Sequence, residues 1–247
     1  MTMRALILSV AALASLPYAA LADETPATKL TLEDRADVYM ARKMYREAID
    51  TYKDAEKTAS DKAILEDKIG IAWHQLGDAA AALKSYQRAV KLDSKYADAI
   101  NNIGTIYYAQ KRYRRAINEY RKALNISPNS AAIWSNLGTA QYARKQFQEM
   151  SESYAKALQL DPAIFEARAG AGTQMQDRAV EDRARYHFEM ARVYAKAGKN
   201  DIALQYLRRS LEEGFSDKAK IEKDPEFAAL KETPEFKDLM TLEPRVL

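Results

Sequence analysis

The fold of this chain is decided by two consecutive stretches of 34 residues, 97–130 (ADAINNIGTIYYAQKRYRRAINEYRKALNISPNS) and 131–164 (AAIWSNLGTAQYARKQFQEMSESYAKALQLDPAI). A glycine and a later tyrosine occupy matching places in both stretches: Gly104 and Tyr120, then Gly138 and Tyr154. Because a small and a large residue recur at one spacing, the two stretches are predicted to be copies of one structural unit.

The same spacing continues toward the N-terminus and divides the chain into units. Tyrosine recurs as Tyr52, Tyr86, Tyr120 and Tyr154, and alanine recurs as Ala55, Ala89, Ala123 and Ala157. With 15 tyrosines among 247 residues, such a register is far from a chance event. We therefore predict contiguous repeats at 29–62, 63–96, 97–130 and 131–164, and a fifth at 184–217.

Each repeat is expected to form two antiparallel helices joined by a short turn. Small residues such as Gly104 on the first helix and Ala116 on the second allow the two helices to approach closely. Lys111-Arg112 supplies the turn, and Pro128 follows the second helix, where proline ends one helix and can begin the next. The predicted fold class is all-α, an α-solenoid of stacked antiparallel helix pairs.

The fourth repeat carries the residues of a known pattern at the expected offsets: Trp134, Leu137-Gly138, Tyr154, Ala157 and Pro162. On these residues the chain resembles the tetratricopeptide-repeat (TPR) family. Gln141 in place of a tyrosine and Met150 in place of an alanine are mild departures. The resemblance implies a right-handed superhelix whose first helices line a concave groove, and a role in binding proteins or peptides.

Composition narrows the classes of function that remain. The chain has no cysteine and two histidines, which excludes disulfides, thiolate catalysis and zinc knuckles. Its net charge is only +3, so neither nucleic acid nor an anionic membrane is favoured as the main partner. No phosphate-binding loop and no Ser/His/Asp set occurs in the sequence. We therefore expect no enzymatic activity and no cofactor.

The first residues are typical of an exported protein. Arg4 precedes a run of apolar residues at 5–16, and Ala20-Leu21-Ala22 offers small residues at a cleavage site. We predict a signal peptide at 1–22, a short linker at 23–28 and a periplasmic protein with no stable membrane insertion after cleavage. The alternative is an uncleaved anchor, but the apolar run is shorter than the roughly 20 residues that span a bilayer.

Two segments depart from the repeat pattern. Residues 165–183 are predicted to be an insertion, either a spacer that changes the angle of the fifth repeat or a segment that gates the groove. Residues 218–247 are predicted to form a C-terminal helical cap. There, Asp224-Pro225 and Thr233-Pro234 are helix starts. The residues expected to cover the apolar end of the stack are Phe227, Leu230, Phe236 and Leu239.

The resemblance places the candidate site on the first helix of each repeat, facing the groove. The predicted groove residues are Asn101, Asn102, Thr105, Tyr108, Ser135, Asn136, Thr139, Tyr142, Arg185 and Arg192. Asn102 and Asn136 are one period apart, and in some relatives such a ladder of amides holds an extended peptide. Asp34 and Lys68 interrupt this ladder in the earlier repeats. The alternative is that the two asparagines follow the family pattern and contact only water.

Charge along the predicted groove changes from acidic to basic. Glu33, Asp37 and Asp67 lie at the N-terminal end, and Arg192 lies in the fifth repeat. Such a gradient could orient a peptide. The alternative, which the sequence slightly favours, is ordinary surface charge. A separate basic run at 111–115, with an interleaved tyrosine, is a weak nucleic-acid signature and is more typical of a solvated face.

The predicted function is a non-catalytic protein- or peptide-binding scaffold of the bacterial cell envelope, with the partner held in the concave groove. Two alternatives stay open: a regulatory or accessory subunit of a periplasmic enzyme, and a self-associating structural repeat protein. On the groove hypothesis, Asn102→Ala combined with Asn136→Ala should weaken partner binding and leave thermal stability nearly unchanged.

Overall fold

The computed structural model describes residues 30–165 and 180–242, and over these ranges the regular structure is helical, without strands. The N-terminal part contains α1 (Leu32–Ala41), α2 (Tyr45–Glu56), α3 (Lys62–Gln75), α4 (Ala79–Leu92), α5 (Ala97–Ala109), α6 (Tyr113–Ile126), α7 (Ala131–Ala143) and α8 (Phe147–Leu160). The C-terminal part contains α10 (Val180–Lys196), α11 (Asn200–Glu212), α12 (Lys218–Lys223), the 3-10 helix η2 (Pro225–Phe227) and α13 (Pro234–Thr241).

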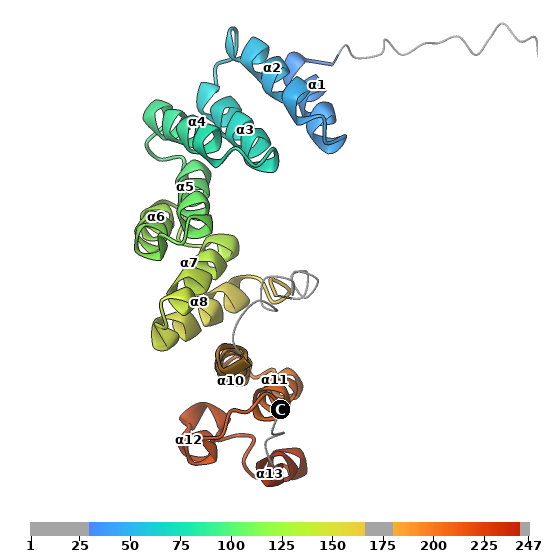
Figure 1. Ribbon diagram of the computed structural model, residues 1–247, viewed down its shortest axis with the longest axis vertical. Helices are drawn as coiled ribbons and strands as arrows, with labels where there is room; N and C mark the ends of the chain where they lie inside the picture. The colour runs from blue at the N-terminus through green and yellow to red at the C-terminus, as the bar shows by residue number, and fades with distance from the viewer. Residues whose placement is uncertain (1–29, 166–179, 243–247) are drawn as a thin grey trace, which may run out of the picture.

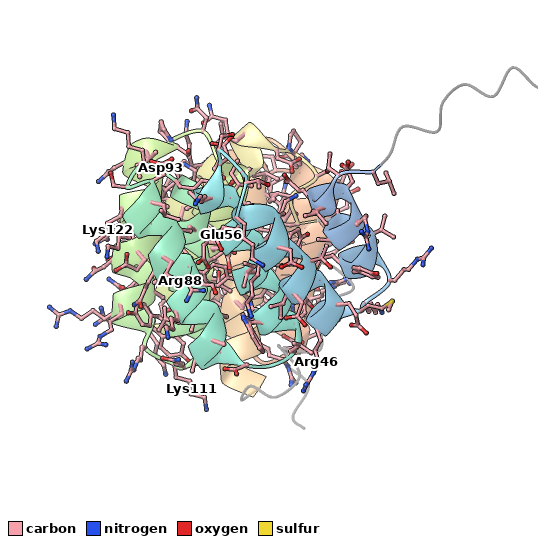
Figure 2. All side chains as sticks on the ribbon, turned by 90° about the horizontal axis from the view of Figure 1, so that it is seen from above. Arg46, Glu56, Arg88, Asp93, Lys111 and Lys122 are labelled. Atoms are coloured by element: carbon pink, nitrogen blue, oxygen red, sulfur yellow. The ribbon has the colours of Figure 1, made fainter. Side chains whose placement is uncertain are left out.

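The helices form an elongated stack of pairs, which confirms the predicted solenoid. From α1 to α11, each helix packs against its neighbours in the described chain, and the pairs follow one another along the long axis from α1 and α2 to α10 and α11 (Figure 1). Seen from above, Lys111 lies at one edge of the molecule and Asp93 at the opposite edge (Figure 2). Turns inside a repeat and loops between repeats therefore emerge at different edges.

Glycines on the first helices set the distance between the two helices of a pair. A Cβ atom built on Gly104 of α5 would lie 2.6 Å from the ring of Tyr120 on α6, which no real contact tolerates. Gly70 stands in the same relation to Tyr86, and Gly138 to Tyr154. The spacing recognised in the sequence is therefore a packing contact, in which a tyrosine ring lies against helix backbone at the glycine.

The turn inside each repeat contains one residue with a left-handed backbone at a constant repeat position. In the second repeat this residue is Gly77, with φ 82°, and in the fifth pair it is Gly198, with φ 71°. Lys43, Lys111 and Lys145 adopt the same conformation with φ near 60°. A lysine is strained there because its Cβ approaches the following carbonyl group.

The C-terminal residues cap the stack as predicted. Phe227, Leu230, Phe236 and Leu239 are buried in one apolar cluster with Phe188 of α10 and Leu207 of α11. The side chain of Asp224 accepts a hydrogen bond from the backbone N–H of Glu226, and that of Thr233 accepts one from Phe236. The end of the array is therefore covered by the chain itself.

Some predictions fall on residues that the structure does not describe. The signal peptide at 1–22, the linker at 23–28 and most of the insertion at 165–183 lie outside the described residues. Helix α10 begins at Val180, ahead of the predicted start of the fifth repeat. Within 30–165 and 180–242, no helix is both long enough and apolar enough to cross a bilayer.

Candidate functional site

The predicted groove contains a row of polar side chains that join neighbouring repeats. On α3, the Nζ atom of Lys68 lies 2.8 Å from Oε1 of Glu33 and 2.8 Å from Oδ1 of Asp37, both on α1. One repeat later, Nδ2 of Asn102 donates to Oδ1 of Asp67 at 2.9 Å.

The third contact of this kind links α7 to α5. Nδ2 of Asn136 donates to Oδ1 of Asn101 at 2.9 Å. Lys68, Asn102 and Asn136 occupy one repeat position, and each contacts the residue 35 places earlier. The three contacts therefore join the same pair of repeat positions, once through a lysine ammonium group and twice through an asparagine amide. We call Glu33, Asp37, Asp67, Lys68, Asn101, Asn102 and Asn136 the polar seam.

The polar seam is continuous across α3, α5 and α7. Within α5, Nδ2 of Asn101 donates to Oδ1 of Asn102 at 3.4 Å. Asp67 is therefore connected through Asn102 and Asn101 to Asn136 by side-chain hydrogen bonds alone. A partner that uses these amides must share or replace hydrogen bonds that already hold the repeats together.

Lys68 has a different role from the one expected from the sequence. The sequence interpretation took it as an interruption of an asparagine ladder, whereas the structure gives it the same role as Asn102 and Asn136. The sequence signal for this shared role was that Lys68 lies one period before Asn102. Since the single charge of Lys68 offsets one of the two negative charges of Glu33 and Asp37, the acidic N-terminal end of the predicted gradient is weaker than the sequence suggests.

Asp67 is the buried acid of the polar seam, with 4% of its surface exposed. The pKa of Asp67 is raised to about 6, chiefly by burial and also by the charge of Asp98, while hydrogen bonds from Asn102 and Tyr96 oppose the rise. Oη of Tyr96 is 3.4 Å from Oδ2 of Asp67. The carboxyl group therefore changes charge close to neutral pH, beside the amide that crosses to α5.

The two threonines of the predicted site are tied to their own repeat. Oγ1 of Thr105 donates to the backbone oxygen of Asn101, and Oγ1 of Thr139 donates to that of Ser135. Each also contacts the tyrosine of the second helix, Tyr120 at 3.4 Å and Tyr154 at 3.0 Å. Both threonines remain half-buried, so part of each residue stays accessible.

Two predicted groove residues are not accessible. Ser135 has no exposed surface, and Tyr142 is 5% exposed. The ring of Tyr142 packs edge-on against Tyr186 of α10, with centroids 5.3 Å apart, and also contacts Phe147. These two side chains therefore leave almost no surface for a partner, and Tyr142 is covered because α10 packs against α8 beside it.

The two arginines expected to form a basic end are paired internally. Arg185 and Arg192 each contact Glu189, at 2.8 Å, and this carboxylate is 1% exposed. Arg192 also lies 2.8 Å from Asp224 at the start of the cap. The predicted charge gradient therefore ends in a neutralised cluster, because the cap brings an acid to α10 that the repeat pattern does not contain.

Apart from the two paired arginines, the predicted groove residues that stay partly exposed are the amides Asn101, Asn102 and Asn136, the threonines Thr105 and Thr139, and Tyr108. This surface offers hydrogen-bond donors, acceptors and an aromatic ring. Among residues 30–165 and 180–242, no group of acids and histidines is arranged to hold a metal ion.

Family models and solved structures agree with this architecture. A TPR repeat model matches residues 70–111 and 104–145, and a tetratricopeptide repeat model matches residues 131–164. The chain therefore contains tetratricopeptide repeats. None of the curated proteins matches the sequence significantly.

Among solved structures, a crystal structure of MamA is 19% identical with a TM-score of 0.50, covering 76% of this chain and 96% of its own. A MamA fragment from Desulfovibrio magneticus RS-1 is 19% identical with a TM-score of 0.51, covering 75% of this chain and 94% of its own. The first TPR domain of Spaghetti (RPAP3), bound to an HSP90 peptide, covers 48% of this chain and 94% of its own, with 22% identity and a TM-score of 0.43. The MamA likenesses show the fold alone.

Proposed function

We propose that this chain is a non-catalytic scaffold that binds a protein or an extended peptide on the concave face of its repeats, after export to the bacterial cell envelope. Proteins built from tetratricopeptide repeats act as protein-interaction scaffolds, and the repeats here are matched by two family models. The observation that carries the proposal is the polar seam, a row of donors and acceptors along the first helices whose amides Asn101, Asn102 and Asn136 are half-buried.

The polar seam suits an extended backbone better than a compact ligand. Its groups lie on successive first helices, so they are spaced along the stack rather than gathered around one point. A peptide backbone presents alternating donors and acceptors along its length, which side-chain amides can match. Asn101, Asn102 and Asn136 form the central part of this surface, and Tyr108 offers an aromatic contact beside it.

Site-specific cross-linking tests the concave face directly. Tyr108 already holds an aromatic ring on α5, so a photoreactive phenylalanine analogue can replace it. This analogue should capture the partner in an extract of the cells that naturally make the protein. The same analogue at Lys122, an exposed residue on the outer helix α6 (Figure 2), is the matched control. Capture that is equal at the two positions, or stronger at Lys122, would contradict binding on the concave face.

Export is tested separately by fractionation of bacterial cells that produce the chain with and without residues 1–22. The charged start, the apolar run at 5–16 and the small residues at 20–22 support export. We expect the full chain to be recovered in the periplasm with an N-terminus at Asp23, and the shortened chain in the cytoplasm. Recovery of the full chain in the membrane fraction, with residues 1–22 still present, would support the anchor instead.

A further inference from the structure

The turn between α5 and α6 carries a concentrated positive charge outside the groove. Lys111, Arg112, Arg114 and Arg115, together with Arg144 from the next turn, surround a hollow of about 270 Å³ beside Tyr113. All of these cations are exposed, and Figure 2 shows Lys111 at the rim of the molecule. We call this surface the basic hollow.

The charges of the basic hollow are not neutralised by the protein. In the part of the chain that the structure describes, none of its five cations forms an ion pair with a carboxylate. Elsewhere on the surface, Lys57 and Lys122 each pair with an acid one helical turn away. Among the described residues, Arg115 instead lies over the ring of Tyr107, 5.9 Å from its centroid, which leaves its charge unpaired with an acid.

The fold does not require this charge. The same repeat positions hold GDAAA at 77–81 in the second repeat and KQFQE at 145–149 in the fourth. Arg114 and Arg115 also lie in the first turn of α6, where the helix dipole disfavours cations. Arg112 is the N-cap residue of α6, and its side chain accepts no hydrogen bond from the backbone N–H groups of the first turn. The cluster therefore opposes helix stability, which points to a role other than folding.

We propose that the basic hollow binds an acidic segment of a partner protein through its carboxylates. Arginine guanidinium groups match carboxylates in a bidentate geometry, and three of them surround the hollow from one turn. The positive charge of the basic hollow comes from the turn between α5 and α6 and from Arg144 in the turn between α7 and α8. A nucleic acid backbone would instead require cations along several repeats. The basic hollow adjoins the concave face, because the ring of Tyr113 packs against that of Tyr108 with centroids 5.4 Å apart.

Fluorescence anisotropy with a fluorescein-labelled oligoglutamate peptide tests this assignment on the purified protein at low salt. The test variant combines Arg112→Gln, Arg114→Gln and Arg144→Gln, whose side chains form no hydrogen bond, ion pair or ring contact among the described residues. The control combines Arg46→Gln, Lys84→Gln and Lys91→Gln, which removes the same formal charge from exposed positions elsewhere. We expect binding to weaken about tenfold in the test variant and less than about twofold in the control.

Three results would overturn the assignment. The unmodified protein could fail to bind the peptide, or the two variants could lose affinity equally, which would make the interaction a net-charge effect. A single-stranded oligonucleotide could also bind more tightly than the peptide and lose its affinity in the test variant alone. That outcome would assign the basic hollow to nucleic acid. Thermal melting by circular dichroism confirms that both variants remain folded.

Discussion

Asn102 on α5 donates a hydrogen bond to Asp67 on α3, with Nδ2 and Oδ1 2.9 Å apart. This bond crosses from one repeat to the next and reaches a carboxylate that is almost wholly buried. An amide that the sequence suggested as a peptide contact therefore also has a structural task. The same is true of Asn136, whose partner is Asn101. Replacing either asparagine is therefore expected to affect the stability of the fold as well as partner binding.

Asn102→Ala is expected to lower the free energy of unfolding by about 1–3 kcal/mol, because it leaves a buried carboxylate with only the long hydrogen bond from Tyr96. Asn136→Ala removes a bond to a neutral, half-buried amide and should cost about 1 kcal/mol. Urea unfolding at neutral pH measures both. The sequence alone predicted nearly unchanged stability for the double variant. A double variant as stable as the unmodified protein would show that the bonds between repeats contribute nothing.

Asp67→Asn is expected to stabilise the protein near neutral pH. The pKa of Asp67 is raised from 3.8 to about 6, so its contribution to stability is full below pH 3.8 and is lost as pH rises through about 6. The asparagine carries no charge and can still accept a bond from Asn102. We expect a gain of about 2 kcal/mol above pH 7 and little difference below pH 4. Urea unfolding at several pH values measures this, and a gain that does not vary with pH would contradict the prediction.

Gly104→Ala is expected to destabilise the third repeat in spite of the better helix propensity of alanine. The new Cβ would lie 2.6 Å from the ring of Tyr120, so the ring or the helix must move. Overpacking of this kind costs about 1–3 kcal/mol, more than the roughly 1 kcal/mol that alanine gains over glycine. Thermal melting by circular dichroism measures the net loss. Adding Tyr120→Leu to Gly104→Ala should cost less than the sum of the two single changes, and strict additivity would argue against the contact.

Lys43→Gly is expected to stabilise the protein by about 0.5–1 kcal/mol, because φ of Lys43 is 60°, a conformation that glycine adopts without strain. Lys84 is an exposed residue inside α4, and Lys84→Gly should instead cost about 1 kcal/mol. The two variants remove the same charge, so opposite signs in thermal melting isolate the backbone effect. Loss of stability in both would show that the turn is not strained.

Local and periodic features were predictable from the sequence. The recurrence of Gly104 and Tyr120 at one spacing identified the helix pairs, because a glycine and a facing tyrosine report a close contact within one repeat. Asp224-Pro225 and Thr233-Pro234 identified the helix starts of the cap, because N-capping depends on residues adjacent in the chain. These interactions span few residues, and their chemistry is visible in the residue types themselves.

What lines the groove was decided only by the tertiary structure. The bonds of Lys68, Asn102 and Asn136 to the preceding repeat depend on how far one helix pair is shifted and turned relative to the next. Tyr142 is buried because α10 packs over it. Arg192 is neutralised because the cap carries Asp224 to it. A repeated sequence specifies its own unit, whereas the exposure of each side chain depends on the neighbour that stacks beside that unit.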